Sequence, residues 1–482
     1  MIPLKIVFIE TKAPDIHVYT RMPLPRLGTL LLGTILQNNG YEAEVQIEAL
    51  GDLDMTAIEK ADVIGISIIT ATAPAGYEMA RQLRTLKKPI IFGGPHATYM
   101  PEETLQHCDF VFRGEADETI LSFIHALEIN KGFEEIPGLS FWKSGAMIHN
   151  ERPAYCQNLD VLPTPDFNLI TNRQKQMSVT PIMTSRGCPY DCEFCSVSNM
   201  FGRQYRFRSP EKALTELENH KRIIKENKIK DQNDWVFFYD DNFSINRKRT
   251  KELLKAMIEA KLAPKHWTAQ ASVDVARDEE LLCLMKKSGC YLLYIGIESI
   301  NPKTLKEYNK KQTAEDIEKA IKTIHRHGIK IHGMFVFGAD NDDKKVIDDT
   351  VRFAKKNNLH SVQFLILTPL PGTRTFGELN KQGRIFNKQW NLYDAHHCVF
   401  VPKNFSAWGL QLRTAKAMLK FYSWSHIFKR ASQLLLRFKN FKETILEISL
   451  KIYGRRSVLG WLKRKKEWLK ILQSLRLRMK NP

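Results

Sequence analysis

Three cysteines within eight residues are the feature that most constrains this chain of 482 residues. Cys188, Cys192 and Cys195 lie in the stretch TSRGCPYDCEFCSV with the spacing C-x3-C-x2-C. A disulfide framework favours an even number of cysteines, and a structural zinc site takes four ligands. Three thiolates on one loop can instead hold three corners of a four-iron cluster and leave one iron free. The alternatives are a zinc site with a distant fourth ligand or three unrelated thiols.

The remaining five cysteines lie far apart, and we interpret each as a small apolar core residue: Cys108, Cys156, Cys283, Cys290 and Cys398. The N-terminal run MIPLKIVFIE is too short for a signal peptide and is typical of a first strand. The sequence has no stretch of about 18 apolar residues, so no membrane-spanning helix is expected. Eight cysteines without secretory features therefore favour a reducing cytoplasm.

Short apolar runs alternate with helical patterns in residues 1–135. We expect strands at 5–10, 42–48, 63–69, 89–94 and 110–115, and the clearest helices at 27–39 and 74–86. This alternation is typical of a doubly wound, Rossmann-like parallel sheet. Ligands of such sheets lie at the carboxyl ends of the strands, where the sequence places Ser67, Thr70, Gly93, Gly94, Gly114 and Glu115.

A second alternation follows a linker at 136–179, in which we expect a small hairpin and a Pro-rich crossing segment. Six strands are expected at 181–184, 235–239, 266–271, 291–297, 330–337 and 361–367, with helices in the intervals. Six strand–helix units predict a partial (β/α)6 barrel over residues 180–375, because a full barrel has eight. The predicted fold is therefore α/β, followed by a mainly helical, basic region at 376–482.

The positive charge of the chain is concentrated in this C-terminal region. Residues 401–482 contain 20 Lys or Arg and three acids, so they carry +17 of the total of +19. On a helix through residues 460–480, one apolar face collects Trp461, Trp468, Leu472, Leu475 and Met479. Such a helix suits an anionic membrane surface, unless its apolar face packs on the barrel and the charges are simply solvated. A nucleic-acid partner is not expected, because no nucleic-acid-binding fold is recognisable.

At the cysteine motif the sequence resembles the radical SAM family, which has an aromatic residue before the last cysteine, here Phe194. The resemblance implies a [4Fe-4S] cluster on Cys188, Cys192 and Cys195. The open iron would chelate S-adenosyl-L-methionine, and an electron from the cluster would release a 5′-deoxyadenosyl radical. The resemblance also implies an electron donor such as flavodoxin or ferredoxin. The cofactors carry the radical chemistry, while the protein positions them and excludes water.

Polar residues at the ends of later barrel strands extend this resemblance. FFYDDNF places Asp240 and Asp241 where the family contacts the methionine amino group, although many members have Gly-Gly-Glu there. AQASVD places Gln270 at the third strand end, and GIES places Glu298 and Ser299 at the fourth, where the family contacts the methionyl or ribosyl part. Acids at strand ends also cap helices, so the order and spacing of these residues carry the prediction.

The N-terminal half resembles the cobalamin-binding domain that is fused to one radical SAM subgroup. IGISIITAT, FGGPHATYMPEE and FRGEADETI carry this resemblance, which implies that the corrin lies near the six strand-end residues named above. Gly93 and Gly94 would let the backbone approach a large flat ligand. The alternative is a Rossmann-like scaffold without a ligand.

One motif departs from the pattern of cobalamin enzymes that bind cobalt through histidine. Those enzymes carry D-x-H-x-x-G after the first strand, whereas DIHVYT at 15–20 has Thr20 in place of the glycine. We therefore expect that His17 does not bind cobalt. An unliganded or weakly liganded cobalt is easier to reduce and remethylate, which suits methyl transfer.

Together the resemblances imply a cobalamin-dependent radical SAM enzyme that methylates an unactivated carbon of a lipid-like or other secondary-metabolite substrate. One S-adenosylmethionine would remethylate cobalamin, and another would yield the radical that removes a substrate hydrogen. No catalytic side chain is assigned. The same machinery without methyl transfer, as in cyclase-like or ring-rearranging members, remains an alternative, as does a non-catalytic cobalamin or redox sensor. A tRNA-methylthiolating enzyme would carry three more N-terminal cysteines, where this chain offers only Cys108 and Cys156.

The small-molecule substrate could itself be associated with a membrane. A cytoplasmic enzyme held at the inner membrane face by its basic C-terminal helices would meet such a substrate directly.

Overall fold

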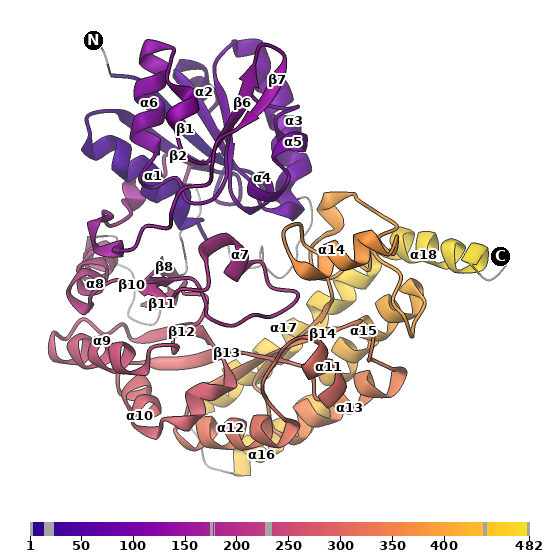
Figure 1. The fold of residues 1–482 in the computed structure, drawn as a ribbon. Helices are drawn as coiled ribbons and strands as arrows, with labels where there is room; N and C mark the ends of the chain where they lie inside the picture. Colours follow the sequence, from indigo (N-terminus) through magenta and orange to yellow (C-terminus); the bar gives the residue numbers. More distant parts are fainter. Residues whose placement is uncertain are drawn as a thin grey trace.

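Two sheets, one mainly parallel and one wholly parallel, organise the chain in the computed structural model (Figure 1). The structure describes residues 3–13, 24–173, 177, 179–226, 234–436 and 441–479. The first sheet belongs to the N-terminal half, and the C-terminal helices pack outside the second sheet. The stretch 15–20 with His17 lies outside the described residues, so its lack of a cobalt contact stays a prediction.

The first sheet has seven strands in the order β2-β1-β3-β4-β5-β6-β7. The five predicted strands are confirmed and are parallel: β1 (Lys5–Glu10), β2 (Glu42–Ile47), β3 (Val63–Ser67), β4 (Ile90–Gly93) and β5 (Phe110–Phe112). The hairpin predicted for the linker also forms, as β6 (Leu139–Lys143) and β7 (Ala146–His149). Because β6 pairs antiparallel with β5, this hairpin extends the first sheet.

Helices cover both faces of the first sheet, which explains why its central strands are apolar without alternation. The core on one face contains residues of α1 and α6, and the core on the other contains residues of α2, α3 and α4. The helices are α1 (Leu27–Asn38), α2 (Met55–Lys60), α3 (Ala73–Leu83), α4 (Pro95–Tyr99), α5 (Pro101–Thr104) and α6 (Ile120–Ile129).

The second sheet has six parallel strands in the order β15-β14-β13-β12-β11-β8, as expected for a partial barrel. They are β8 (Thr180–Ile182), β11 (Trp235–Phe238), β12 (His266–Ala271), β13 (Cys290–Glu298), β14 (Lys330–Phe337) and β15 (Ser361–Ile366). The connecting helices are α8 (Pro210–Glu226), α9 (Arg247–Glu259), α10 (Glu279–Lys287), α11 (Pro302–Glu307), α12 (Ala314–Arg326), α13 (Lys344–Lys356) and α14 (Arg374–Lys381).

Short polar side chains determine where several barrel helices begin. Asp278 accepts a hydrogen bond from the third backbone N–H of α10, and Asp343 does the same for α13. Thr313 and Asp316 form a reciprocal capping box at the start of α12. Each cap satisfies a backbone group that the helix itself cannot, and it stabilises the helix by typically about 1 kcal/mol. The same helices then bury apolar stripes, such as Ile317, Ile321 and Ile324 of α12, against the sheet.

In the described part of the chain, the barrel is followed by helices α15 (Ala407–Phe421), α16 (Trp424–Leu436), α17 (Phe441–Arg464) and α18 (Lys466–Met479). Trp468 and Leu472 of α18 are buried, and the indole of Trp468 donates to Gln411 Oε1 at 3.3 Å. These two residues therefore pack on the body of the protein, which is the second of the two alternatives for this face. None of the described helices has the length and apolar composition to cross a bilayer.

Gly94→Ala is expected to destabilise the first sheet. Gly94 has a φ of +96°, and a Cβ there would lie 2.5 Å from the carbonyl oxygen of Ile68. We expect the variant to lower the free energy of unfolding by about 1–3 kcal/mol, measured by urea unfolding.

Gly93→Ala is the matched control, because a Cβ on Gly93 would meet no atom within 4 Å. We expect its free energy of unfolding to change by less than about 0.5 kcal/mol. Equal losses in the two variants would contradict the constraint on Gly94.

Candidate active site

The cysteine loop, residues 187–195, follows β9 (Ser185–Arg186) and leads into α7 (Val197–Phe201). β9 pairs antiparallel with β10 (Arg206–Phe207), so the loop starts from a hydrogen-bonded ribbon that lies between the two sheets (Figure 1). Gly187 has a φ of +85°, and a Cβ there would lie 2.4 Å from the carbonyl oxygen of Gln204. The tight entry into the loop therefore requires glycine at this position.

The thiols of Cys188, Cys192 and Cys195 are partly exposed and lie close together. Burial raises the pKa of Cys188 to about 11 and that of Cys195 to about 12, and negative charge on neighbouring thiols raises both. Three thiolates therefore need metal cations to share this loop. Among the described residues, no three His, Cys, Asp or Glu side chains converge on a single metal ion. Three cysteine thiolates on one loop are the ligands that would hold an iron–sulfur cluster.

The structure separates the two acids at the end of β11. Asp240 is fully buried and accepts hydrogen bonds from the backbone of Thr184 at 2.6 Å and of Ser185 at 2.9 Å. Asp241 accepts one from Gly187 N at 3.1 Å and lies beside two of the thiols. Burial raises the pKa of Asp241 to about 7, and the charge of Asp240 also raises it. Asp240 therefore holds the chain before the cysteine loop, and Asp241 is the acid that faces it.

Glu298 ends β13 in a left-handed conformation, with a φ of +62°. Its carboxylate pairs with Lys310 Nζ at 3.1 Å, and both side chains are largely buried. Burial lowers the pKa of Lys310, but Glu298 and the thiols of Cys192 and Cys195 outweigh that effect and raise it above its ordinary value. The structure thus brings a cation to the cysteine loop that sequence reasoning missed, because nothing in the KKQT stretch separates Lys310 from Lys311.

Two further predicted residues have backbone or turn roles in this region. The hydroxyl of Ser299 accepts from Asn301 N at 3.1 Å, in the turn that precedes α11. Gln270 lies partly exposed near the end of β12, and its carbonyl oxygen accepts from Phe243 N at 2.9 Å. A ligand contact by the Gln270 side chain stays a prediction.

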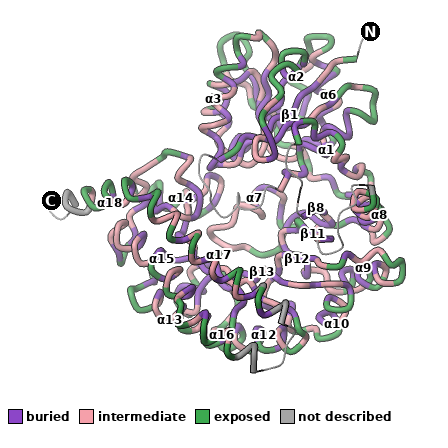
Figure 2. The backbone as a smooth tube through the Cα atoms, turned by 180° about the vertical axis from the view of Figure 1, so that it is seen from behind, coloured by how far each residue is buried: buried purple, intermediate pink, exposed green. Residues whose placement is uncertain are grey.

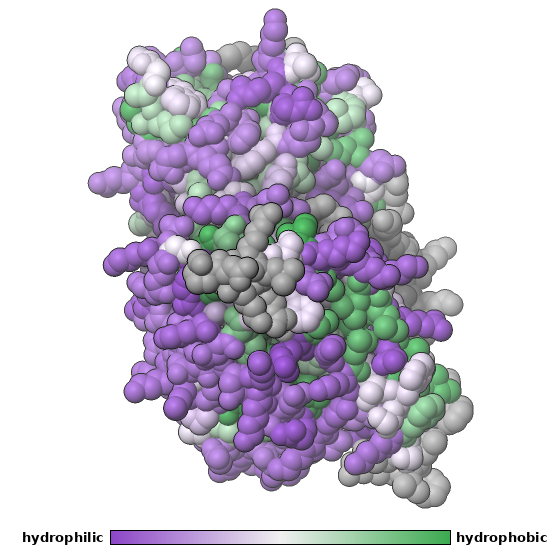
Figure 3. Space-filling view, turned by 90° about the vertical axis from the view of Figure 1, so that its right-hand side faces the viewer, coloured by the Kyte–Doolittle hydropathy of each residue, from purple (hydrophilic) through white to green (hydrophobic). Residues whose placement is uncertain are grey.

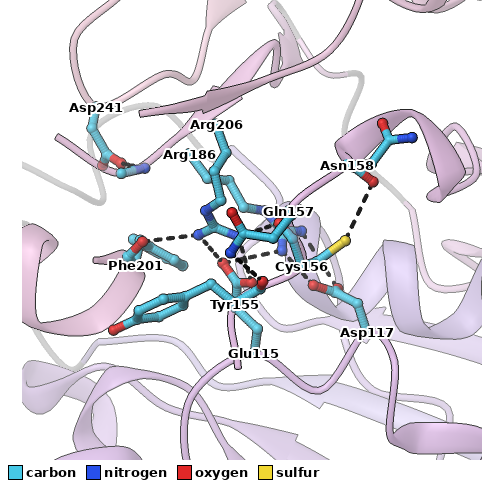
Figure 4. Close-up of polar contacts among 11 residues, drawn as sticks. Glu115, Asp117, Tyr155, Cys156, Gln157, Asn158, Arg186, Phe201, Arg206 and Asp241 are labelled. Carbon is cyan, nitrogen blue, oxygen red and sulfur yellow. Dashed lines mark hydrogen bonds and ion pairs between the residues drawn. The ribbon is translucent and has the colours of Figure 1, made fainter. Parts of the chain in front are cut away.

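The six strand-end residues of the first sheet have different environments. Ser67 and Gly93 are neighbours across β3 and β4, and both are partly exposed. Thr70 is buried, and the backbone of Gly114 donates to Thr98 Oγ1 at 3.0 Å. Both carboxylate oxygens of Glu115 accept hydrogen bonds from Arg206 (Figure 4). Corrin contacts at all six strand-end residues stay predictions.

The carboxyl ends of both sheets meet at the cysteine loop. Tyr99, at the end of α4, packs against the backbone of Gly372 and interacts electrostatically with Cys195. Tyr239 follows the end of β11, and the charges of Arg26 and Glu10 from the first domain act on it across the interface. A group bound at the edge of the first sheet would therefore face a group bound on the cysteines.

Known proteins share this combination of domains. Residues 18–124 match the family model of the B12 binding domain, and residues 182–354 match that of the Radical SAM superfamily. An uncharacterised methyltransferase of Pyrococcus horikoshii is 30% identical over 415 residues, which cover 83% of this chain and 88% of that protein. Bacteriochlorophyllide d C-12(1)-methyltransferase of Chlorobaculum tepidum is 30% identical over 413 residues, covering 85% of this chain and 84% of that protein.

A solved structure supports the fold. The cobalamin-dependent S-adenosylmethionine radical enzyme OxsB, with aqua-cobalamin and S-adenosylmethionine bound, superposes with a TM-score of 0.73 at 17% identity. The match covers 99% of this chain and 75% of that one.

Lys310→Met is expected to lower the free energy of unfolding by about 3 kcal/mol, because it leaves the Glu298 carboxylate buried without a partner. Replacing both members, as Lys310→Met with Glu298→Leu, should recover most of this loss. Urea unfolding measures each value.

Lys322→Met serves as the control, because Lys322 is exposed and pairs with Glu318 on the surface of α12. The free energy of unfolding of Lys322→Met should fall by less than about 1 kcal/mol. If Lys310→Met were no more destabilising than Lys322→Met, the Lys310–Glu298 pair would not be the buried contact described above.

Proposed function

The chain belongs to the family of radical SAM methyltransferases with a B12-binding domain, and from this premise we propose that it methylates an unactivated carbon of a lipid-like or other secondary-metabolite substrate. The observation that carries the proposal is the position of the cysteine loop between the carboxyl ends of two parallel sheets. Both ends are ligand-binding edges in folds of this kind. The substrate therefore enters the space that these edges share.

The chain's own residues supply the contacts that this chemistry needs. When bound, the iron–sulfur cluster and S-adenosylmethionine supply a carbon-centred radical, and cobalamin supplies the methyl group. Cys188, Cys192 and Cys195 would hold the cluster. Asp241 offers a carboxylate beside the thiols for the methionine ammonium group, and Lys310 offers an ammonium group for the methionine carboxylate. Flavodoxin or ferredoxin would deliver the electron.

Transfer of an isotopic label tests this proposal. Enzyme reconstituted with iron, sulfide and cobalamin is incubated without oxygen with methyl-deuterated S-adenosylmethionine and a lipid extract of a strain that lacks the gene. We expect a product that retains the labelled methyl group. A product with an altered ring structure and no label would replace methyl transfer with cyclisation.

Cys195→Ala is expected to lose the iron–sulfur absorption and all release of 5′-deoxyadenosine, because a two-thiolate loop cannot hold the cluster with one open iron. Cys283→Ala is the control, since Cys283 is a partly exposed thiol on α10, outside the cysteine loop. Release of 5′-deoxyadenosine by Cys195→Ala at the control rate would overturn the assignment of the loop.

We also propose that the enzyme contacts the inner face of a membrane, through α16 and α17 rather than α18. Figure 2 shows both helices outside the barrel at the back of the molecule. Trp424 is 46% exposed, Phe428 67% and Tyr453 60%, and the rings of Trp424 and Phe428 stack with centroids 6.1 Å apart. The side that carries the C-terminus is largely hydrophilic, with hydrophobic residues gathered toward the back (Figure 3).

The orientation of α17 supports this contact. The helix buries Glu447 and Lys451, which meet Arg430 and the carbonyl oxygen of His360, while Tyr453 and other apolar residues face solvent. When a helix buries its charged side chains and exposes its apolar ones, the exposed apolar surface indicates an interaction site. Lys429 of α16 and Arg456 of α17 are exposed, and Arg455 lies over the Trp424 ring, 5.6 Å from its centroid. Each basic residue contributes on the order of 1 kcal/mol near an anionic leaflet. The cytoplasmic leaflet carries that charge.

Co-sedimentation with anionic vesicles tests the membrane contact. Trp424→Ser with Phe428→Ser is expected to weaken binding roughly tenfold, because two interfacial aromatics are lost. Val161→Ser removes an exposed apolar side chain in the linker, away from α16 and α17, and is the control. Equal partitioning of the two variants would leave α16 without a membrane role.

A further inference from the structure

A buried group of four charges joins the first domain to the ribbon that carries the cysteine loop (Figure 4). Glu115 and Asp117 come from the loop after β5, and Arg186 and Arg206 are paired residues of β9 and β10. We call this group the interdomain clamp. Arg206 binds both oxygens of Glu115, at 2.7 and 2.8 Å. Arg186 binds Asp117 and lies 3.4 Å from Glu115.

The clamp is closed to solvent and electrically balanced. All four side chains are at most 8% exposed, and two positive charges face two negative ones. The two terminal nitrogens of Arg206 also donate to the carbonyl oxygens of Cys156 at 2.8 Å and Phe201 at 2.9 Å. The second of these carbonyls ends α7, which follows the cysteine loop. Arg206 thus contacts the first domain, the linker and the segment after the loop.

Stability alone is a weak reason for such a group. Removing charges from water costs several kcal/mol per ion, and apolar residues of the same volume often stabilise a buried position equally well. Charged pairs add directionality, because the planar guanidinium fork donates to both oxygens of a carboxylate only within a narrow range of orientations. The clamp therefore defines how the two domains are oriented as well as holding them together.

The clamp is separated from the cysteine loop by no intervening residue. Arg186 directly precedes Gly187, whose N–H is bound by Asp241, and Cys188 follows. On the barrel side, Asp240 binds the backbone just before Arg186. The start of the loop is therefore fixed from both domains at once.

From this geometry we propose that Arg186, Arg206, Glu115 and Asp117 are positioning residues that set the separation between the edge of the first sheet and the cysteine loop. The proposal rests on the proposed function, since it assigns the edge to cobalamin and the loop to the iron–sulfur cluster. The spacing matters because a misplacement of about 1 Å between reacting groups can cost about a hundredfold in rate. The clamp keeps the radical source and the methyl donor in register around one substrate.

The distance between the two cofactors tests the clamp directly. Cob(II)alamin and the reduced cluster are both paramagnetic, so pulsed EPR measures their dipolar coupling in the reconstituted protein without substrate. The test variant is Arg186→Met with Asp117→Leu, which replaces a buried pair by apolar side chains and leaves the Glu115–Arg206 pair in place. We expect its melting temperature and its iron and cobalamin contents to stay close to wild type, and its distance distribution to become at least about twofold broader.

A matched exposed pair provides the control. Arg81 and Glu78 on α3 form the same two-bond contact, at 2.6 and 2.8 Å, on the surface of the first domain. Arg81→Met with Glu78→Leu should leave the distribution unchanged. Arg186→Lys, which keeps the charge and loses the fork, should broaden it to an intermediate width.

A wild-type distribution in a loaded Arg186→Met, Asp117→Leu protein would overturn the proposal. The same distribution in Arg186→Lys would overturn it if the double variant failed to fold. Because the measurement needs no turnover, either result would leave the proposed methyl transfer standing. Absence of labelled product from a wild-type protein with a normal distance would instead refute the methyl transfer alone.

Discussion

All strands of a parallel sheet end at the same edge, and in this chain two such edges face each other across one loop of three cysteines. The positions of the loops and helices follow from this arrangement of the two edges. Loops after the strands must supply ligand contacts and also join the domains. Helices must stay on the outer faces, where caps such as Thr313 and buried stripes such as that of α12 keep them.

Charged groups that are buried near the cysteine loop, between the two sheet edges, have hydrogen-bond or ion-pair partners within the chain. Asp240 binds the backbone before the cysteine loop, and Glu298 binds Lys310 beside it. A lone buried charge would cost several kcal/mol, and pairing offsets much of that cost. Glu298 has a left-handed backbone, and its carboxylate lies 3.1 Å from Lys310 Nζ. Rigid, paired groups of this kind suit a site in which a radical must reach only its substrate.

Much of the fold was predictable from local patterns, because apolar runs, helical stripes and caps are local features. The eleven parallel strands of the two sheets and the cysteine motif were visible in this way. A strand-end position predicts which edge a residue lies on, but not which partner it binds. The sequence therefore placed Glu115 and Asp240 correctly at a sheet edge. It could not predict that Glu115 accepts from Arg206 and Asp240 from Thr184, because these partners are distant in the sequence. Lys310 was missed for the same reason.

The C-terminal helices show a second limit of sequence patterns. Helical periodicity identified the apolar face of Trp468 and Leu472 correctly, but it could not tell whether that face meets protein or membrane. On α17 the pattern is inverted, because Lys451 and Glu447 find partners inside. Helical periodicity predicts which residues share a face, but tertiary packing determines which face is buried.

The ratio of two products tests the central claim most directly. Wild-type enzyme with both cofactors, its substrate and a reductant is quenched during turnover, and S-adenosylhomocysteine and 5′-deoxyadenosine are quantified together. Methyl transfer through cobalamin predicts equal amounts of the two, because one S-adenosylmethionine donates the methyl group and another yields the radical. Formation of 5′-deoxyadenosine and product without S-adenosylhomocysteine would contradict the account.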